Sequence, residues 1–274
     1  MLQLCINSIL KNSAFNHQII LHINEGADGT LEWVKSKGFD FTASENNIGV
    51  CYALNAAVGL ARTDYILYLN DDMYVCPDWD KYLWEEAQAM PDKLFFLSAT
   101  AIEPFDAGKK IAIAPYSFGS TPAEFREEEL LKSFKELPMH DWNGSSWPPS
   151  LVHRDMWNAV GGYSTEFSPG FYSDPDFSLK LWKAGVRNFK GISRSRVYHF
   201  LEHSTKRLGN KNVVKGNRIF LNKWGITAAM FYKFYLQMGA EYKGLLSEPE
   251  ETNSFRIKKL TGKIKKIFKS VTAI

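Results

Sequence analysis

Tyr65-Ile66-Leu67-Tyr68-Leu69 runs directly into Asn70-Asp71-Asp72. The first five residues are apolar or aromatic without alternation, which predicts a strand buried within a parallel sheet. Acidic residues that follow such a strand lie at its carboxyl end, where open α/β sheets bind ligands. Two carboxylates and an amide suit a hard divalent cation, which proteins usually bind together with substrate phosphates. A simple turn is the alternative, since Asn and Asp are common turn residues.

Strands and helices alternate on both sides of this stretch. We expect helices at 2–10, 50–60, 78–90, 127–134, 155–160 and 176–184, a further helix carrying Leu31 and Val34, and strands at 18–23, 39–42, 94–99 and 186–198. This alternation predicts an α/β fold with a doubly wound, mainly parallel sheet flanked by helices. The segment 103–149 is irregular apart from its one helix, which is typical of a functional loop or lid.

The composition is that of a globular protein of ordinary polarity. The chain has 274 residues, of which 45% are hydrophobic and 23% charged, and its formal net charge of +3 gives no reason to expect a nucleic acid partner. Cys5, Cys51 and Cys76 have no metal-ligand spacing, so we expect small buried hydrophobes in a reducing compartment. Neither a signal peptide nor an apolar run of membrane-spanning length is found, and we expect a cytoplasmic protein.

The C-terminal segment differs from the rest. We divide the chain into a domain at 1–225 and a helical, basic amphipathic extension at 226–274. An apolar stripe follows helical spacing at Ile257, Leu260, Ile264, Ile267 and Val271, with lysines largely on the other positions. Such a helix suits an anionic membrane surface at the inner face of the membrane. A solvated helix packed on the domain is the alternative.

Two further motifs carry chemistry. Asp174-Pro175-Asp176-Phe177 opens a predicted helix, so Asp174 is an N-cap, a general base facing a pocket, or both. A capping Asp keeps a low pKa, which we expect here. His199 ends the last strand, where an imidazole beside carboxylates is a candidate metal ligand, although a structural histidine is the alternative. His203 competes for the same role.

Taken in order, these motifs resemble family 2 glycosyltransferases of the GT-A (Rossmann-like) fold, over about residues 2–224. The resemblance rests on Asn70-Asp71-Asp72, the Gly161-Gly162-Tyr163 turn, Asp174 with the helix that follows it, and His199. It extends to Asp28-Gly29-Thr30-Leu31-Glu32, to Asn46-Asn47-Ile48-Gly49 and to Asn55. It implies an inverting transferase that moves a sugar from a nucleotide-diphosphate donor to a glycan or lipid-linked acceptor.

The resemblance also implies roles for single residues. Asp72 and His199 match positions that bind Mn²⁺ or Mg²⁺, and Asp174 matches the catalytic base of inverting members. We assign the donor side to Asn24, Glu25, Asn47, Gly49, Asn55, Asn70 and Asp71. We assign the acceptor side to Trp142, Asn143, Trp147 and Asp176, because aromatic faces suit sugar rings; the alternative is that these tryptophans fill the core.

The sequence departs from the family pattern at three points. Asn70 stands where the first Asp of the metal motif is usual, and Ser173 stands where a Glu precedes the base. The family normally opens with an apolar strand and a Pro-x-Tyr-like loop that contacts the nucleotide base, and this sequence begins after them. A shortened sequence and a degenerate site are the two interpretations of that start.

Two other classes of function compete with a transferase. A non-catalytic GT-A-like module that binds nucleotide or glycan is compatible with the same motifs. A nucleotidyltransferase also has acidic metal sites on an α/β sheet, but it should show a Gly-rich phosphate loop bearing Lys or Arg near the start, and none is visible.

Overall fold

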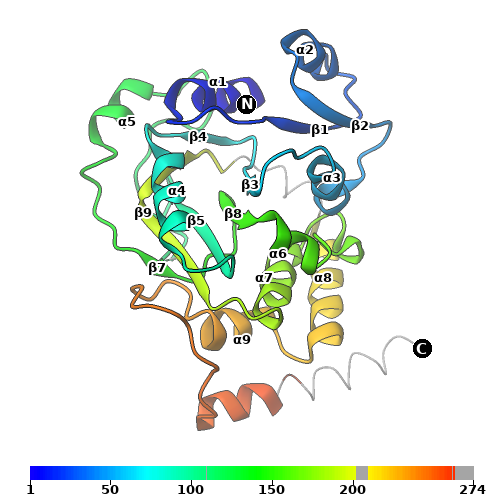
Figure 1. The fold of residues 1–274 in the computed structure, drawn as a ribbon, viewed down its shortest axis with the longest axis vertical. Helices are drawn as coiled ribbons and strands as arrows, with labels where there is room; N and C mark the ends of the chain where they lie inside the picture. Colours follow the sequence, from blue (N-terminus) through cyan, green and yellow to red (C-terminus); the bar gives the residue numbers. More distant parts are fainter. Residues whose placement is uncertain (109, 202–208, 261, 263–274) are drawn as a thin grey trace.

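The computed structural model describes residues 1–108, 110–201, 209–260 and 262. A seven-stranded mixed sheet lies between helices, and a two-stranded parallel sheet lies beside it (Figure 1). The larger sheet is formed by β3 (Tyr65–Tyr68), β4 (Met73–Val75), β5 (Phe95–Ile102), β6 (Ala112–Ile113), β7 (Trp142–Asn143), β8 (Ser150–His153) and β9 (Asn188–His199). The smaller one is formed by β1 (Ile20–Asn24) and β2 (Asp40–Ser44).

The predicted helices are all present and alternate with strands up to β3, whereas the strands β4, β6, β7 and β8 and the helix at 209–224 were not predicted. The α-helices are α1 (Leu2–Asn12), α2 (Thr30–Lys37), α3 (Gly49–Val58), α4 (Trp79–Ala89), α5 (Glu127–Ser133), α6 (Arg154–Ala159), α7 (Ser173–Lys183), α8 (Gly209–Trp224) and α9 (Ala228–Met230). A single 3₁₀ turn, η1 (Thr165–Phe167), precedes α7, and a π-helical turn, η3 (Phe231–Tyr235), follows α9. None of the helices in the described ranges is long and apolar enough to cross a membrane.

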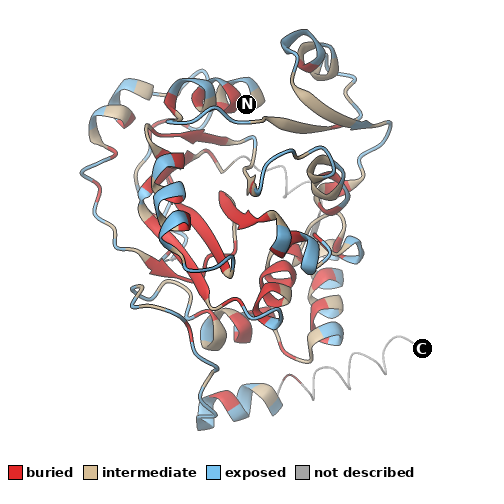
Figure 2. Cartoon of the chain, in the orientation of Figure 1, coloured by how far each residue is buried: buried red, intermediate tan, exposed pale blue. Residues whose placement is uncertain are grey.

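The parallel pair β5 and β9 forms the spine of the core. Both strands are buried along almost their whole length (Figure 2). Successive side chains of β5 point to opposite faces of the sheet. Phe96 therefore packs against Phe177 of α7, while Leu97 lies in the cluster that includes Trp79 of α4. One strand thus fixes helices on both faces.

β3, the strand that precedes Asn70-Asp71-Asp72, lies at the edge of the larger sheet rather than inside it. Its partner is β8, in antiparallel register from Tyr65 opposite His153 to Tyr68 opposite Ser150. The expectation of a buried parallel strand is therefore wrong in its pairing, and only Ile66 of its four residues is fully buried. A continuous apolar run indicates cover on both faces of a strand, and it carries no information about the neighbours on its two edges. The larger sheet likewise mixes parallel and antiparallel pairs, whereas a mainly parallel one was expected.

The predicted C-terminal extension packs its first part into the main core. Phe231 contacts Trp182 with their ring centroids 6.4 Å apart, and Phe255 contacts Phe234 at 5.4 Å. Phe255 is only 3% exposed, whereas Ile257 is 64% exposed. The later members of the predicted stripe, Ile264, Ile267 and Val271, lie outside the described residues.

All three cysteines are free and buried, as expected. Burial raises the pKa of the Cys5 thiol to about 12 and that of Cys51 to about 11, so both stay protonated at neutral pH. The side chains act as small hydrophobes.

Candidate active site

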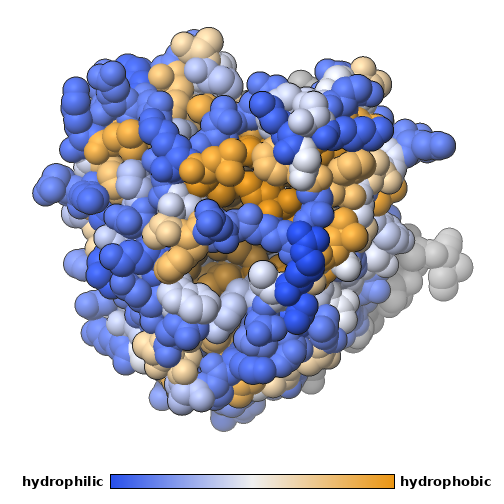
Figure 3. Space-filling model, turned by 45° about the horizontal axis from the view of Figure 1, so that its top comes forward, coloured by the Kyte–Doolittle hydropathy of each residue, from blue (hydrophilic) through white to orange (hydrophobic). Residues whose placement is uncertain are grey.

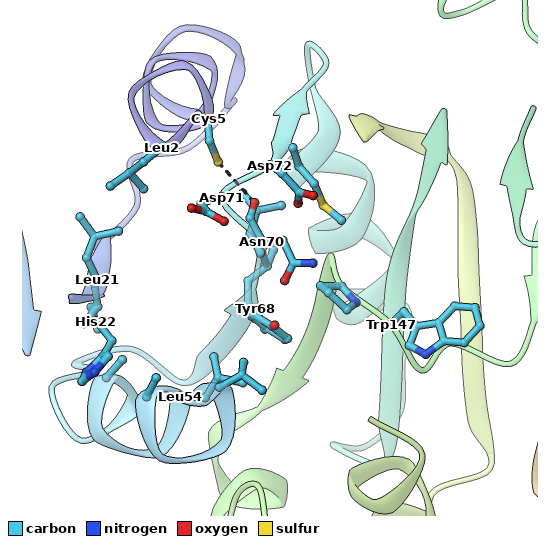
Figure 4. Close-up of a pocket in the computed structure, with 18 of the residues that line it drawn as sticks. Leu2, Cys5, Leu21, His22, Leu54, Tyr68, Asn70, Asp71, Asp72 and Trp147 are labelled. Carbon is cyan, nitrogen blue, oxygen red and sulfur yellow. Dashed lines mark hydrogen bonds between the residues drawn. The ribbon is translucent and has the colours of Figure 1, made fainter. Parts of the chain in front are cut away.

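A cleft of about 2180 Å³ runs between β1 and the free edge of β3, and it collects most of the predicted site residues. Figure 3 shows apolar surface where this face of the molecule is hollowed. In Figure 4, Leu21 and His22 of β1 lie on one wall, Tyr68 and Asn70 lie on the other, and Leu2 and Cys5 of α1 lie above. The cleft is large enough for a nucleotide sugar, since ligand pockets are usually ~300–1,000 Å³.

The predicted pair Asp72 and His199 meets at one end of this cleft. Asp72 directly precedes β4, and the register of β4 with β9 places Met73 opposite His199. The Phe200 N–H donates to the carbonyl of Asp72 at 3.0 Å, which joins the two strand ends. As a result the Nε2 atom of His199 lies 3.3 Å from the Oδ2 atom of Asp72.

Glu103 completes this corner, and the sequence analysis assigned it no role. Its Oε1 atom lies 3.1 Å from Nδ1 of His199, and its side chain is only 7% exposed. Burial alone would lower the pKa of His199, but the carboxylates of Asp72 and Glu103 raise it to about 9. Glu103 directly follows β5, just as the acidic pair follows β3, so the same sequence rule would have found it.

The donor atoms at this corner fit a divalent cation in part. Among the residues that the structure describes, no three His, Cys, Asp or Glu side chains converge as a complete metal site. Asp72 and His199 offer one carboxylate and one imidazole, a set that suits Mn²⁺ or Mg²⁺ when substrate phosphates supply further oxygens. Asp71 and Asn70 line the cleft beside them (Figure 4).

The predicted donor-side residues Asn24, Glu25, Asn47 and Gly49 line the same cleft. Asn24 accepts the Ile48 N–H at 2.9 Å, and Asn47 accepts the Gly49 N–H at 2.9 Å, so both shape the loop that precedes α3. Gly49 has φ +76°, and a Cβ there would lie 2.4 Å from Oγ of Ser168. A glycine is therefore required where this loop meets the segment that leads to α7.

Asp174 faces the cleft from the first turn of α7. The helix begins at Ser173 and its N-cap is Tyr172, so the expectation that Asp174 caps the helix is wrong. Burial raises the pKa of Asp174 to about 7, against a hydrogen bond from the Tyr163 hydroxyl at 3.2 Å that lowers it. The expected low pKa is therefore wrong as well, because desolvation of this half-buried side chain outweighs the one hydrogen bond that favours its charged form.

Asp176, two residues further on, turns away from the cleft. It is fully buried and pairs with Nζ of Lys223 at 2.9 Å, with Nε1 of Trp224 at 2.8 Å and with Oγ of Ser164 at 2.6 Å. The predicted acceptor contact is therefore corrected: Asp176 fastens α8 to α7. Residues two apart in a helix point to nearly opposite sides, which explains why neighbouring acids have such different surroundings.

The structure also relocates other predicted residues. Asn55 is absent from the cleft lining and bonds both backbone groups of Tyr163. Trp142 is 4% exposed, and its indole donates to Oγ1 of Thr100 at 2.9 Å. Burial thus favours the core-filling alternative for Trp142, and Asn143 is likewise buried, at 5% exposed.

Trp147, which we assigned to the acceptor, lines the cleft (Figure 4). Its ring lies edge-on to Tyr232 with centroids 5.6 Å apart. Trp142 also borders the cleft but is buried, whereas Trp147 is half-buried there. His203, the alternative to His199, lies outside the described residues.

Comparisons with known proteins show the family and the fold of this chain. The family model described as glycosyl transferase family 2 matches residues 1–143, which is more than half of the chain. No curated protein gives a significant match to the sequence.

Solved structures of glycosyltransferases share the fold. A crystal structure of GalNAc-T7 with UDP, GalNAc and Mn²⁺ has a TM-score of 0.57 at 15% identity, over 86% of this chain and 47% of that one. TarS of S. aureus has a TM-score of 0.54 at 11% identity, over 97% of this chain and 41% of that one. A 1–349 fragment of TarS gives 0.53 at 12% identity, over 98% and 68%. This chain thus spans less than half of the first two, and the predicted GT-A fold class is confirmed.

The buried position of Asp176 yields a prediction about stability. Asp176→Asn should lower the free energy of unfolding by about 2–3 kcal/mol, because Lys223 loses its buried partner and keeps only the exposed carboxylate of Glu166. Chemical denaturation measures the effect. The matched control is Asp155→Asn, which breaks an exposed 2.6 Å pair with Lys93 and should leave stability close to that of the unchanged protein. Equal losses in the two variants would contradict the structural role.

Proposed function

This chain belongs to glycosyl transferase family 2, and we propose that it transfers a sugar from a nucleotide-diphosphate donor to a glycan or lipid-linked acceptor with inversion of configuration. The observation that carries the proposal is the single cleft lined by Asp71, Asp72 and His199 near one strand end and by Asp174 at the start of α7. An acidic corner for a diphosphate and a separate carboxylate that faces the same cleft are the two parts that such a transfer needs.

We assign the divalent cation to Asp72 and His199, with Mn²⁺ or Mg²⁺ as the candidates. When bound, the cation would supply positive charge against the leaving diphosphate. Asp72 and His199 are already 3.3 Å apart, and because the carboxylates of Asp72 and Glu103 raise the pKa of His199 to about 9, the imidazole would release the proton on Nε2 when it binds the ion. Asp71 and Asn70 would contact the donor beside it, while Asn24, Glu25, Asn47 and Gly49 would meet the nucleoside.

Asp174 is the base in this proposal. The acceptor hydroxyl transfers its proton to the Asp174 carboxylate as the hydroxyl oxygen attacks the anomeric carbon, and the diphosphate leaves from the opposite face. A pKa of about 7 suits this role, since general bases work best when their pKa lies near the working pH. The acceptor would rest against Trp147, which lines the cleft.

The tail supports a peripheral location at an anionic membrane surface. Phe255 anchors the start of the tail in the core, and beyond it Ile257 and Leu260 are 64% and 59% exposed. Four lysines follow at 263, 265, 266 and 269 in the sequence. An acceptor carried by a lipid would be reached from such a surface.

The assignment of the cation to Asp72 yields a prediction about donor binding. A panel of nucleotide sugars, titrated by calorimetry with and without Mn²⁺, should contain at least one donor whose affinity rises with the metal. Asp72→Ala should abolish that dependence, whereas Asp64→Ala, which removes an exposed carboxylate, should preserve it. The site assignment fails if Asp72→Ala retains the metal-dependent affinity.

The assignment of Asp174 as the base yields a prediction about turnover. Asp174→Asn should bind donor normally but lose turnover by about 10²–10⁴-fold, because the amide cannot accept the proton. In the unchanged protein the rate should fall as the pH drops below about 7, where Asp174 becomes protonated. A loss confined to thermal stability would contradict a catalytic role. Donor binding without turnover in the unchanged protein would favour the non-catalytic module.

The proposed membrane location yields a prediction about binding of the tail to vesicles. Removing residues 261–274 retains the Phe255 anchor but deletes four lysines, each of which contributes about 1 kcal/mol near an anionic surface. Sedimentation with vesicles rich in phosphatidylserine should therefore weaken at least about tenfold. Vesicles of phosphatidylcholine alone should bind both proteins poorly. Identical sedimentation of the two proteins with anionic vesicles would refute the membrane proposal.

A further inference from the structure

A chain of contacts connects α3 to the proposed base through Tyr163. Nδ2 of Asn55 donates to the carbonyl of Tyr163 at 2.8 Å, and the N–H of Tyr163 donates to Oδ1 of Asn55 at 2.9 Å. Gly162 permits this approach, because a Cβ there would lie 2.4 Å from Oδ1 of Asn55. Two hydrogen bonds from one side chain therefore fix the backbone of Tyr163.

The ring of Tyr163 is fixed as firmly as its backbone. It is 2% exposed and stacks on Phe177, with centroids 4.7 Å apart and planes 9° apart. Trp157 lies on it at 5.5 Å. With backbone and ring both held, the hydroxyl oxygen is fixed beside Asp174, and it donates to Oδ1 of Asp174 at 3.2 Å.

We propose that Tyr163 is a positioning residue for Asp174 and that Asn55 acts through Tyr163. The inference rests on the proposed function, in which Asp174 is the base. Tyr163 holds Oδ1 of the carboxylate, so Oδ2 is left to receive the proton of the acceptor hydroxyl. The resemblance gave Asn55 a donor-binding role, and its contacts with Tyr163 give it a role on the base side instead.

The surroundings of Asp174 make the hydrogen bond from Tyr163 important for the protonation state of Asp174. The titratable groups that act on it are Cys51 on α3, Tyr68 on β3, Tyr232 on η3 and Tyr163 itself, and burial raises the pKa of each. All four are therefore neutral near pH 7. Asp176, on the same helix, is paired with Lys223 on the far side. Tyr163 is thus the group that favours the ionised form of Asp174 against desolvation.

The test compares Tyr163→Phe with the unchanged protein. The variant lacks the phenolic oxygen that donates to Asp174. In a pH–rate profile with the donor found by the panel, the midpoint of the fall in turnover at low pH should therefore move up by about one pH unit. At a pH about one unit below the original midpoint the rate should be about tenfold lower, and donor affinity should be unchanged. The matched control is Tyr74→Phe, which also removes a buried hydroxyl, one bonded to Asn12 and Glu127. In Tyr74→Phe the midpoint of the fall in turnover at low pH should stay where it is in the unchanged protein.

A second readout separates this inference from the proposed function. Carbon-13 NMR of the aspartate carboxyls, with Asp174→Asn to assign the signal, measures the pKa of Asp174 without turnover. If no donor is turned over but Tyr163→Phe raises that pKa by about one unit, the proposed function fails and the positioning role stands. An unchanged Asp174 pKa in Tyr163→Phe overturns the positioning role.

Asn55→Ala tests the other half of the chain of contacts. Because it frees the backbone of Tyr163, it should lower kcat several-fold, leave the donor KM unchanged and raise the Asp174 pKa in the same direction as Tyr163→Phe. A raised donor KM with an unchanged Asp174 pKa would restore the donor-binding role and overturn this part of the inference.

Discussion

The pairing of β4 with β9 is the constraint on which the candidate site depends. It sets Met73 opposite His199 and lets the Phe200 N–H bond the carbonyl of Asp72, so an acid and an imidazole from distant parts of the sequence share one corner. The other edge of β9 pairs with β5, which brings Glu103 to the second nitrogen of His199. A slip of one residue in either register would turn these side chains to opposite faces.

Burial acts differently on two acids of the same helix. Asp176 meets Lys223 and two neutral donors, so its charge is matched and its role is to join α7 and α8. Asp174 meets neutral phenols and a thiol, and desolvation raises its pKa to about 7. Asp176 is fully buried and matched by a cation, whereas Asp174 is half-buried and faces the cleft, so partners and access together separate a structural carboxylate from one that can exchange a proton near neutral pH.

Much of this arrangement could be predicted from the sequence. The order of helices and strands, the cleft at the ends of strands, and the meeting of Asp72 with His199 follow from apolar periodicity and from the motif order. The edge position of β3 could not be predicted, because cover by helices produces the same apolar run in edge and internal strands. The roles of Asp176 and Asn55 depend on contacts with Lys223 and Tyr163 that no local pattern records.

The central claim is that a sugar donor is bound at the Asn70–Asp72 corner and attacked from the side of Asp174. Its most direct test is ¹H NMR of slow donor hydrolysis, in which water replaces the unknown acceptor. From an α-linked donor that binds in the presence of Mn²⁺, the account predicts that the β-anomer of the free sugar accumulates first, before mutarotation. Initial release of the α-anomer would contradict the single displacement at this cleft.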